Sequence, residues 1–113
     1  MINRRVLGLT EEIVVIGNEN QNLTVRIDTG ATCSSIDIKL AEKLGWGPVV
    51  RNRIVKSASG IKKREMVKGE VVIQGLQLDG EFTLADRSHM TYPILIGQNI
   101  LKEGMFLVDP MKD

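Results

Sequence analysis

Apolar and polar residues alternate along the stretch that leads to Asp28. Residues 23–27 place an apolar side chain at every second position, which is typical of a half-buried strand. The β-branched run at residues 13–16 comes before it, and the polar residues 17–22 lie between the two. We therefore predict a hairpin that delivers Asp28 onto a glycine turn. Because Asp is disfavoured in strands and rarely buried alone, this carboxylate needs a partner or a task.

A helix is predicted directly after Asp37. The Asp37 side chain can cap its first turn, and Gly45 can end it. The buried stripe of this helix is expected to contain Ile38, Ala41 and either Leu44 or Leu40.

The stretch from residue 51 to residue 64 is rich in positive charge. It contains no acid, and its cations are Arg51, Arg53, Lys56, Lys62, Lys63 and Arg64. Residues 57–60 in its middle have the composition of a hairpin tip. We expect a projecting two-stranded ribbon with these cations on its arms.

The remaining pattern predicts further strands and a short second helix. Asp79-Gly80 is the expected hairpin turn, Gly75 the expected bulge, and residues 86–89 a polar loop. The predicted strands cover residues 5–9, 66–73, 76–85, 94–96 and 106–108, and the second helix covers residues 98–103.

Length and composition indicate one globular domain over residues 1–113. The 113 residues are 42% hydrophobic and 26% charged, and the net charge of +1 favours no particular partner. The longest apolar run, residues 13–16, is far shorter than the ~20 residues of a membrane span, and no signal-peptide core follows the first residues. We expect a cytoplasmic protein without membrane contact. One His and one Cys fall short of a zinc ligand set, so no metal and no cofactor are predicted.

Two motifs resemble the active-site segments of retropepsin-like aspartic peptidases. Asp28-Thr29-Gly30-Ala31 follows an apolar strand, and residues 92–101 carry a second apolar strand, a glycine and a helix. The similarity covers about residues 7–110 and is greatest to a prokaryotic branch named ATP-dependent zinc proteases, of the RimB type. The segments that resemble this branch are residues 53–60, 82–90 and 106–110.

The resemblance implies a mainly β fold and a homodimer. The expected lobe is closed and barrel-like, with a flap hairpin and one or two short helices. Aspartic peptidases use two carboxylates that share a proton, and one Asp-Thr-Gly supplies half of that pair, so a two-fold axis must supply the other half. In this interpretation Asp28 carries the chemistry, the Thr29 hydroxyl locks the two loops together, and Gly30 leaves room for substrate. Residues 4–9 and 106–109 are expected to form an intermolecular sheet.

Substrate contacts are expected from the cleft wall and the flap. Ala31 and Thr32 would line the cleft, and Arg87 would pair either with Asp86 or with a substrate carboxylate. The flap would add Lys56, Ser57, Ala58, Ser59 and Gly60. Six cations would attract a peptide rich in Glu or Asp, and family members are associated with ligases that add glutamates to protein tails. The resemblance therefore implies a peptidase that acts on acidic, glutamate-rich tails.

One position departs from the retropepsin pattern. Retropepsins commonly have an arginine where this chain has Gln98, and that arginine anchors an ionic network near the dimer interface. We therefore expect a weaker dimer contact at this position.

Other functions stay open on the residues alone. A non-catalytic homodimeric binding module of the same fold could hold an acidic protein through the ribbon. Cys33 and His89 could act as nucleophile and base. One His and one Cys are too few zinc ligands to favour a metal-dependent hydrolase. An aromatic content of 4% with balanced charge disfavours nucleic-acid binding. No Walker-type glycine loop is present, so any ATP dependence is expected to come from a partner.

Overall fold

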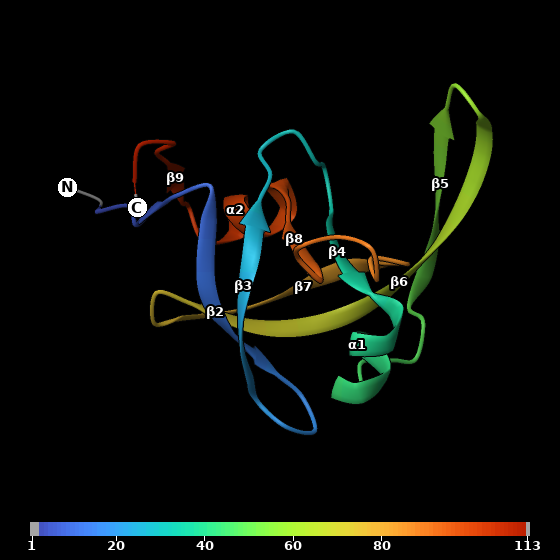
Figure 1. Ribbon diagram of the computed structural model, residues 1–113, viewed down its shortest axis with the longest axis horizontal. Coiled ribbons are helices and arrows are strands. Elements are labelled where there is room, and N and C mark those ends of the chain that lie inside the picture. The colour runs from blue at the N-terminus through green and yellow to red at the C-terminus, as the bar shows by residue number, and fades with distance from the viewer. Residues whose placement is uncertain (1–2, 113) are drawn as a thin grey trace.

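The computed structural model describes residues 3–112, with Ser57 described by its backbone alone (Figure 1). The mainly β architecture predicted from the sequence is confirmed. Over these residues the strands are β1 (Val6–Leu7), β2 (Thr10–Ile16), β3 (Gln21–Ile27), β4 (Ser34–Asp37), β5 (Arg51–Ser57), β6 (Gly60–Ile73), β7 (Leu76–Ala85), β8 (Ile94–Ile96) and β9 (Leu107–Val108), and the helices are α1 (Ile38–Leu44) and α2 (Gln98–Glu103).

Seven of these strands form one curved sheet in the order β2-β3-β8-β4-β7-β6-β5. Strand β2 also pairs with β6, so β2 has hydrogen-bonded neighbours on both edges. The part of β6 before Met66 pairs with β5 alone, and these two arms project from the body as the predicted ribbon (Figure 1). The loop after β3 rises between this ribbon and β9 (Figure 1).

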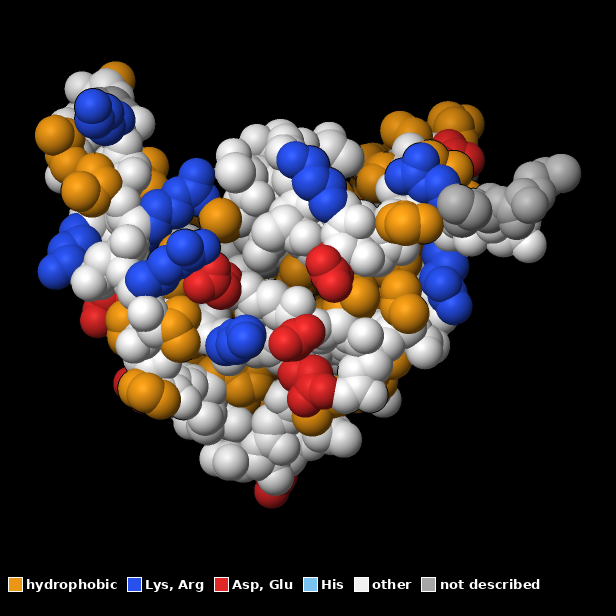
Figure 2. All heavy atoms as spheres, turned by 180° about the vertical axis from the view of Figure 1, so that it is seen from behind, with side chains coloured by type: hydrophobic (Ala, Val, Ile, Leu, Met, Phe, Trp, Pro, Cys, Tyr) orange, Lys and Arg blue, Asp and Glu red, His pale blue; other side chains and the backbone are white. Residues whose placement is uncertain are grey.

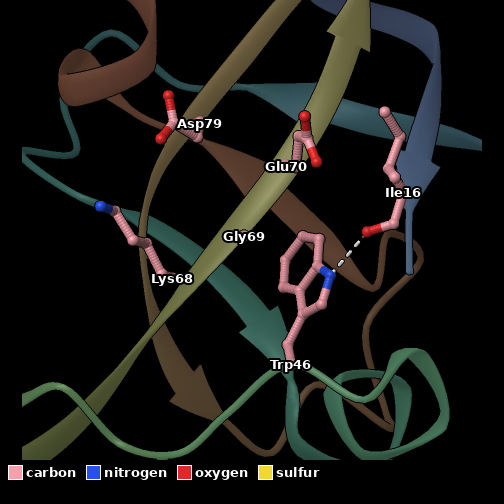
Figure 3. Close-up of a pocket in the computed structure, with 6 residues that line it drawn as sticks. All are labelled: Ile16, Trp46, Lys68, Gly69, Glu70 and Asp79. Carbon is pink, nitrogen blue, oxygen red and sulfur yellow. Dashed lines mark hydrogen bonds between the residues drawn. The ribbon is translucent and has the colours of Figure 1, made fainter. Parts of the chain in front are cut away.

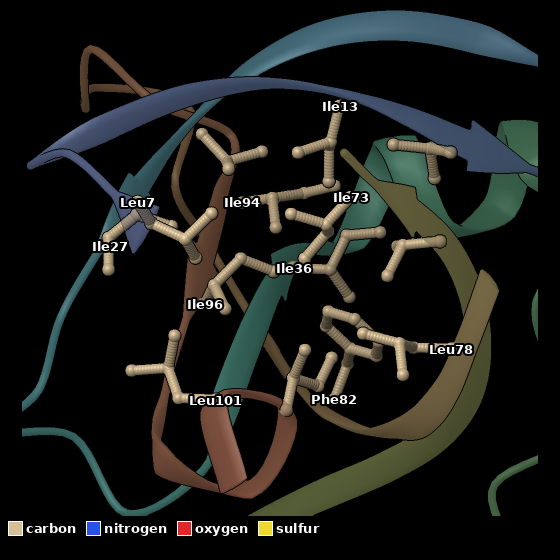
Figure 4. Close-up of a cluster of buried hydrophobic side chains, with 14 of the residues drawn as sticks. Leu7, Ile13, Ile27, Ile36, Ile73, Leu78, Phe82, Ile94, Ile96 and Leu101 are labelled. Atoms are coloured by element: carbon tan, nitrogen blue, oxygen red, sulfur yellow. The ribbon is translucent and has the colours of Figure 1, made fainter. Parts of the chain in front are cut away.

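The core lies inside the curved sheet and takes alternate residues from its strands. In β2 and β3 the buried positions are two apart; the sequence predicted this alternation for residues 23–27. Figure 4 shows the cluster, whose labelled members are Leu7, Ile13, Ile27, Ile36, Ile73, Leu78, Phe82, Ile94, Ile96 and Leu101. Burying one such side chain stabilises the fold by about 1.5–3 kcal/mol, so this cluster is the main support of the sheet that carries the site.

The predicted turn between β6 and β7 was wrong by five residues. Asp79 and Gly80 lie inside β7, opposite Glu70 and Gly69, and the chain turns at Gln74-Gly75 instead. Both turn residues have positive φ, at 48° and 78°, which suits a tight hairpin turn. Gln74 accepts this conformation because its side-chain amide donates to the carbonyl of Val6 at 2.8 Å.

Helix α1 begins and ends where the sequence predicted. The Asp37 side chain accepts a hydrogen bond from the backbone N–H of Leu40, and Gly45 closes the helix with φ 75°. Ala41 and Leu44 are buried, but Ile38 is 41% exposed, so its assignment to the buried stripe was wrong. Ile38 is the first helical residue and follows strand β4, which the sequence did not reveal.

The two chain ends pair with each other within the chain. Strands β1 and β9 form a short parallel ladder, and the Arg4 guanidinium donates to the carbonyls of Met105 and Phe106. Lys112 bonds the Glu11 carboxylate at 2.9 Å. Burial alone would raise the pKa of Glu11, but hydrogen bonds from the Gly8 N–H and from Lys112 outweigh it, and the pKa is lowered.

Candidate functional site

Asp28 lies at the end of β3, on the loop that rises from the body (Figure 1). Its backbone N–H donates to the carbonyl of Ile96 in β8 at 2.9 Å. Its carboxylate oxygen Oδ1 accepts the backbone N–H of Gly30 at 2.9 Å. Asp28 is half-buried, whereas Thr29 and Gly30 are exposed. The carboxylate is thus held in one direction by its own loop and stays accessible.

A buried polar network lies beneath this loop. Ser34 is fully buried; its hydroxyl donates to the side-chain oxygen of Asn99 at 2.8 Å and accepts the N–H of Gly97 at 2.9 Å. The Asn99 amide group then donates to the carbonyl of Glu81 in β7. The network joins the strand after the Asp28 loop to α2 and to β7. Sequence reasoning missed it, because Ser34 and Asn99 are 65 positions apart and no local pattern links them.

Gly97 allows the second motif to approach the first. A Cβ atom there would lie 2.6 Å from the carbonyl oxygen of Cys33 and 2.8 Å from that of Ala31. The next backbone N–H, of Gln98, donates to the Ala31 carbonyl at 2.8 Å. The two segments singled out by the sequence therefore meet in the fold, and a glycine is required at their contact.

Gln98 stabilises the Asp28 loop from the same side. Its side-chain amide donates to the carbonyl of Thr29 at 2.8 Å. A hollow of about 340 Å³ next to this contact is lined by Arg4, Thr29, Gln98, Leu101, Lys102, Phe106, Leu107 and Val108. The residue that departs from the retropepsin pattern is thus engaged with the loop of its own chain.

A second hollow, of about 350 Å³, opens between the loop and the base of the ribbon. Three predicted substrate-binding residues, Ala31, Thr32 and Arg87, line it. Arg53 and Arg64 of the ribbon also line it, although no pattern in the sequence distinguished them from the other ribbon cations. The remaining lining residues are Cys33, Ser35, Val55, Thr83, Ala85, Asp86 and Met90.

The predicted flap-tip residues do not line this hollow. Lys56, Ala58, Ser59 and Gly60 are exposed at the far end of the ribbon, and for Ser57 only the backbone is described. Figure 2 shows Lys and Arg side chains gathered along this projection, at the upper left. The structure therefore places the tip residues apart from the loop in this single chain.

Arg87 is turned toward the backbone and not toward Asp86. Its guanidinium Nε donates to the Tyr92 carbonyl at 3.0 Å, and its backbone N–H donates to Asp37. Burial lowers the pKa of Arg87, and Asp37 opposes this in part. Asp86 instead accepts the hydroxyl and N–H of Ser88, and these two bonds lower the pKa of its carboxyl.

A third hollow lies around Trp46, apart from the predicted site residues (Figure 3). The indole N–H donates to the Ile16 carbonyl at 2.8 Å. One edge of the ring covers Gly69, where a Cβ would lie 2.3 Å from it, and the ring packs on Phe82 with centroids 4.9 Å apart. Trp46 is thus a packing residue that contacts β6 and β7 and lies against the core.

The described residues bring together neither a metal site nor the Cys33–His89 pair. Among residues 3–112, no group of three or more His, Cys, Asp or Glu side chains could hold a metal ion. Cys33 lines the hollow beside the loop, and the described residues that line it do not include His89. Over the same residues, no helix has the length and apolar character needed to cross a membrane.

The solved structures that share this fold include a bacterial protein and two viral proteases. A protein of unknown function, Lpg0085 from Legionella pneumophila, aligns with a TM-score of 0.72 at 18% identity, over 97% of this chain and 96% of that one. The protease of EIAV, solved with the inhibitor HBY-793, has a TM-score of 0.66 at 17% identity, over 86% and 88%. The simian foamy virus protease has a TM-score of 0.64 at 19% identity, over 85% and 94%. The fold is therefore that of the retroviral proteases.

A family model places the chain more narrowly. Residues 46–113 match the family described as retropepsin-like aspartic endopeptidase RimB, which confirms the resemblance found in the sequence. The chain belongs to this RimB-like family. The matched range contains the ribbon, Gly97 and Asn99, whereas Asp28 precedes it. A comparison with curated proteins gave no match.

Proposed function

We propose that this protein is an aspartic peptidase that cleaves peptide bonds in acidic protein tails, acting as a two-fold homodimer. The observation that carries the proposal is the Asp28 carboxylate, half-buried and oriented by the Gly30 N–H. Fixed positioning of a catalytic group is a large part of its effect. The buried network under the loop supplies that fixed position.

A second copy would supply the second carboxylate. The chain has one Asp-Thr-Gly, and a two-fold axis near Asp28 would bring it opposite its own copy. The face beside the loop favours such a contact because it is partly apolar: Met105 is 46% exposed and Leu107 is 45% exposed. Thr29 is exposed at the edge of this face.

The reaction needs one protonated and one ionised Asp28. The ionised carboxylate accepts a proton from a water whose oxygen attacks the scissile carbonyl carbon, and the protonated carboxyl donates to the carbonyl oxygen, giving a tetrahedral diol. Collapse of the diol breaks the C–N bond, and the nitrogen leaves as an amine after taking a proton from an Asp28 carboxyl. No metal takes part in these steps.

Acidic substrates are favoured by the charge of the ribbon. Arg51 is paired with Glu81, and the other ribbon cations would create a local positive field that attracts and orients a peptide rich in Glu. Such attraction is weakened by salt, so KM for a glutamate-rich peptide should rise with ionic strength.

The test is hydrolysis of internally quenched peptides at several protein concentrations. We expect cleavage of a glutamate-rich peptide, a bell-shaped pH profile, a specific activity that rises as dimers form, and inhibition by a statine-type compound. A chelator should have no direct effect. Inhibition by a chelator that zinc reverses would contradict the proposal. Salt-sensitive binding without hydrolysis at any concentration would instead support the non-catalytic binding module.

A further inference from the structure

The two faces of the ribbon differ in what they present. Side chains alternate between the faces of a strand, and directly opposed residues share a face. Arg53 is opposite Arg64 in the β5–β6 ladder, and both line the hollow beside the Asp28 loop. Ile54 is opposite Lys63 on the other face, where Ile54 is 66% exposed. Arg53 and Arg64 therefore face this hollow, and Lys63 lies on the opposite face of the ribbon.

Positive charge at this hollow exceeds negative charge. Arg53, Arg64 and Arg87 line it, and Asp86 is the acid among the described lining residues. Asp86 already accepts two hydrogen bonds from Ser88. Like charges placed directly opposite across two strands destabilise the pairing, so the Arg53–Arg64 pair is unfavourable until an anion lies between or beside them.

The three side chains are all guanidinium groups, which are well suited to bind an oxyanion. A guanidinium presents a planar fork of donors that binds a carboxylate or phosphate through two parallel hydrogen bonds. Arg87 is half-buried, with its Nε engaged by the Tyr92 carbonyl, which fixes the plane of its fork. A hollow of about 350 Å³ has room for one side chain bearing such a group.

We infer that Arg53, Arg64 and Arg87 form a subsite for one oxyanionic side chain of the peptide, and that these residues, beyond the general attraction by the ribbon's charge, determine which side chain is bound there. The inference rests on the proposed function, because the ligand is a peptide in the cleft beside Asp28. It differs from the expectation for the ribbon as a whole, because a general field would weight Lys63 and Arg64 alike.

Binding to a variant that cannot hydrolyse tests the subsite separately from catalysis. The full chain carrying Asp28→Asn is titrated with a fluorescent peptide that contains one Glu, with the same peptide containing Gln, and with one containing phosphoserine. Arg53→Gln or Arg64→Gln should weaken binding of the Glu peptide about 10-fold or more and leave the Gln peptide nearly unchanged. Lys63→Gln removes the same charge from the other face and should change either affinity less than about 2-fold.

The outcomes separate the alternatives. Tighter binding of the phosphoserine peptide than of the Glu peptide, with the same dependence on both arginines, would support the subsite and assign it to phosphate. Equal losses in Arg64→Gln and Lys63→Gln would overturn the inference in favour of a general field. Equal binding of Glu and Gln peptides by the Asp28→Asn protein would also overturn it. Arginine-dependent binding by a protein whose parent cleaves nothing would leave the subsite intact and remove the proposed function.

In the parent protein the same subsite should determine where cleavage occurs. A set of peptides with a single Glu moved through successive positions should show one preferred register in kcat/KM. Arg64→Glu should abolish that preference and favour the peptide with Lys at the same position. Arg64→Lys keeps the charge without the planar fork and should lie between the two. Circular dichroism of each variant confirms that the fold is retained.

Discussion

The loop that carries Asp28 and the ribbon of β5 and β6 lie on the same side of the molecule but are held in different ways. The loop is cross-linked to β8 and α2 through buried polar groups, including the fully buried Ser34. The outer part of the ribbon has two strands only, because β5 is the edge strand of the sheet and β7 pairs with β6 only from Met66 onward. A catalytic carboxylate must be fixed, whereas an arm that admits a peptide must be able to open.

The buried polar contacts lie under the Asp28 loop, and the outer part of the ribbon is mostly exposed. Segments with few buried apolar contacts open most easily in a folded protein, and Ile54 and Ile61 on the ribbon are 66% and 70% exposed. Substitutions in the buried network under the Asp28 loop should therefore lower the free energy of unfolding. Substitutions at the ribbon tip should change substrate binding and leave stability nearly unchanged.

The largest effect is expected at Asp28 itself. Asp28→Asn removes the general base and acid of the proposed reaction and should lower kcat/KM about 10³-fold or more, with the thermal midpoint nearly unchanged. Asp79→Asn, an exposed acid in β7, is the matched control and should retain full activity. Equal activities of the two variants would remove Asp28 from the mechanism.

Gly97→Ala should be the most damaging substitution for stability among those considered. Its Cβ would lie 2.6 Å from the Cys33 carbonyl oxygen, so the loop and α2 must move apart at a cost of about 3 kcal/mol. Urea denaturation measures this cost. A change below about 0.5 kcal/mol would mean that the two motifs are not in tight contact.

Ser34→Ala should cause the next largest loss of stability. The change leaves the Gly97 N–H and one lone pair of the Asn99 oxygen without their partner in a buried place, which costs about 1–3 kcal/mol. Ser35→Ala is the control, because its hydroxyl makes one long contact of 3.4 Å. Similar stabilities of the two variants would contradict the role of the buried network.

Glu11→Gln should have a smaller effect that depends on pH. The lowered pKa of Glu11 means that its ionised form stabilises the fold above the ordinary carboxyl value, and that this contribution is lost as the pH falls through the lowered pKa. At neutral pH the variant should be less stable by about 1 kcal/mol. The difference should vanish in acid, and one that persisted there would show that charge is not its cause.

Ile61→Ser should have the smallest effect. This side chain is 70% exposed near the ribbon tip, so the free energy of unfolding should change by less than about 0.5 kcal/mol. Thermal unfolding at low protein concentration is the measurement. A larger loss would mean that the ribbon packs against another surface, and the contrast with the loop would fail.

Local patterns predicted some elements well because their causes are local. The alternation before Asp28, the Asp37 and Gly45 caps, and the ribbon tip all depend on neighbouring residues. The turn at Gln74-Gly75 was missed because a long-range bond to Val6 supports Gln74, and the more typical Asp79-Gly80 was absorbed into a strand.

The two motifs of the candidate site could be predicted from the sequence, but the buried polar network beneath them could not. Asp28 and Gly97 stand out in the sequence, and the fold brings their segments together. Ser34 and Asn99 did not stand out, because a buried serine has no local signature. The choice of Arg53 and Arg64 over the other ribbon cations depends on strand register, which composition does not reveal.

A crystal structure of the protein with a statine-type inhibitor tests the central claim most directly. We predict one inhibitor for two chains, with its hydroxyl within about 2.6–3.2 Å of both Asp28 carboxylates across a two-fold axis. An inhibitor held by one chain, with the Asp28 side chains of neighbouring copies far apart, would contradict the account.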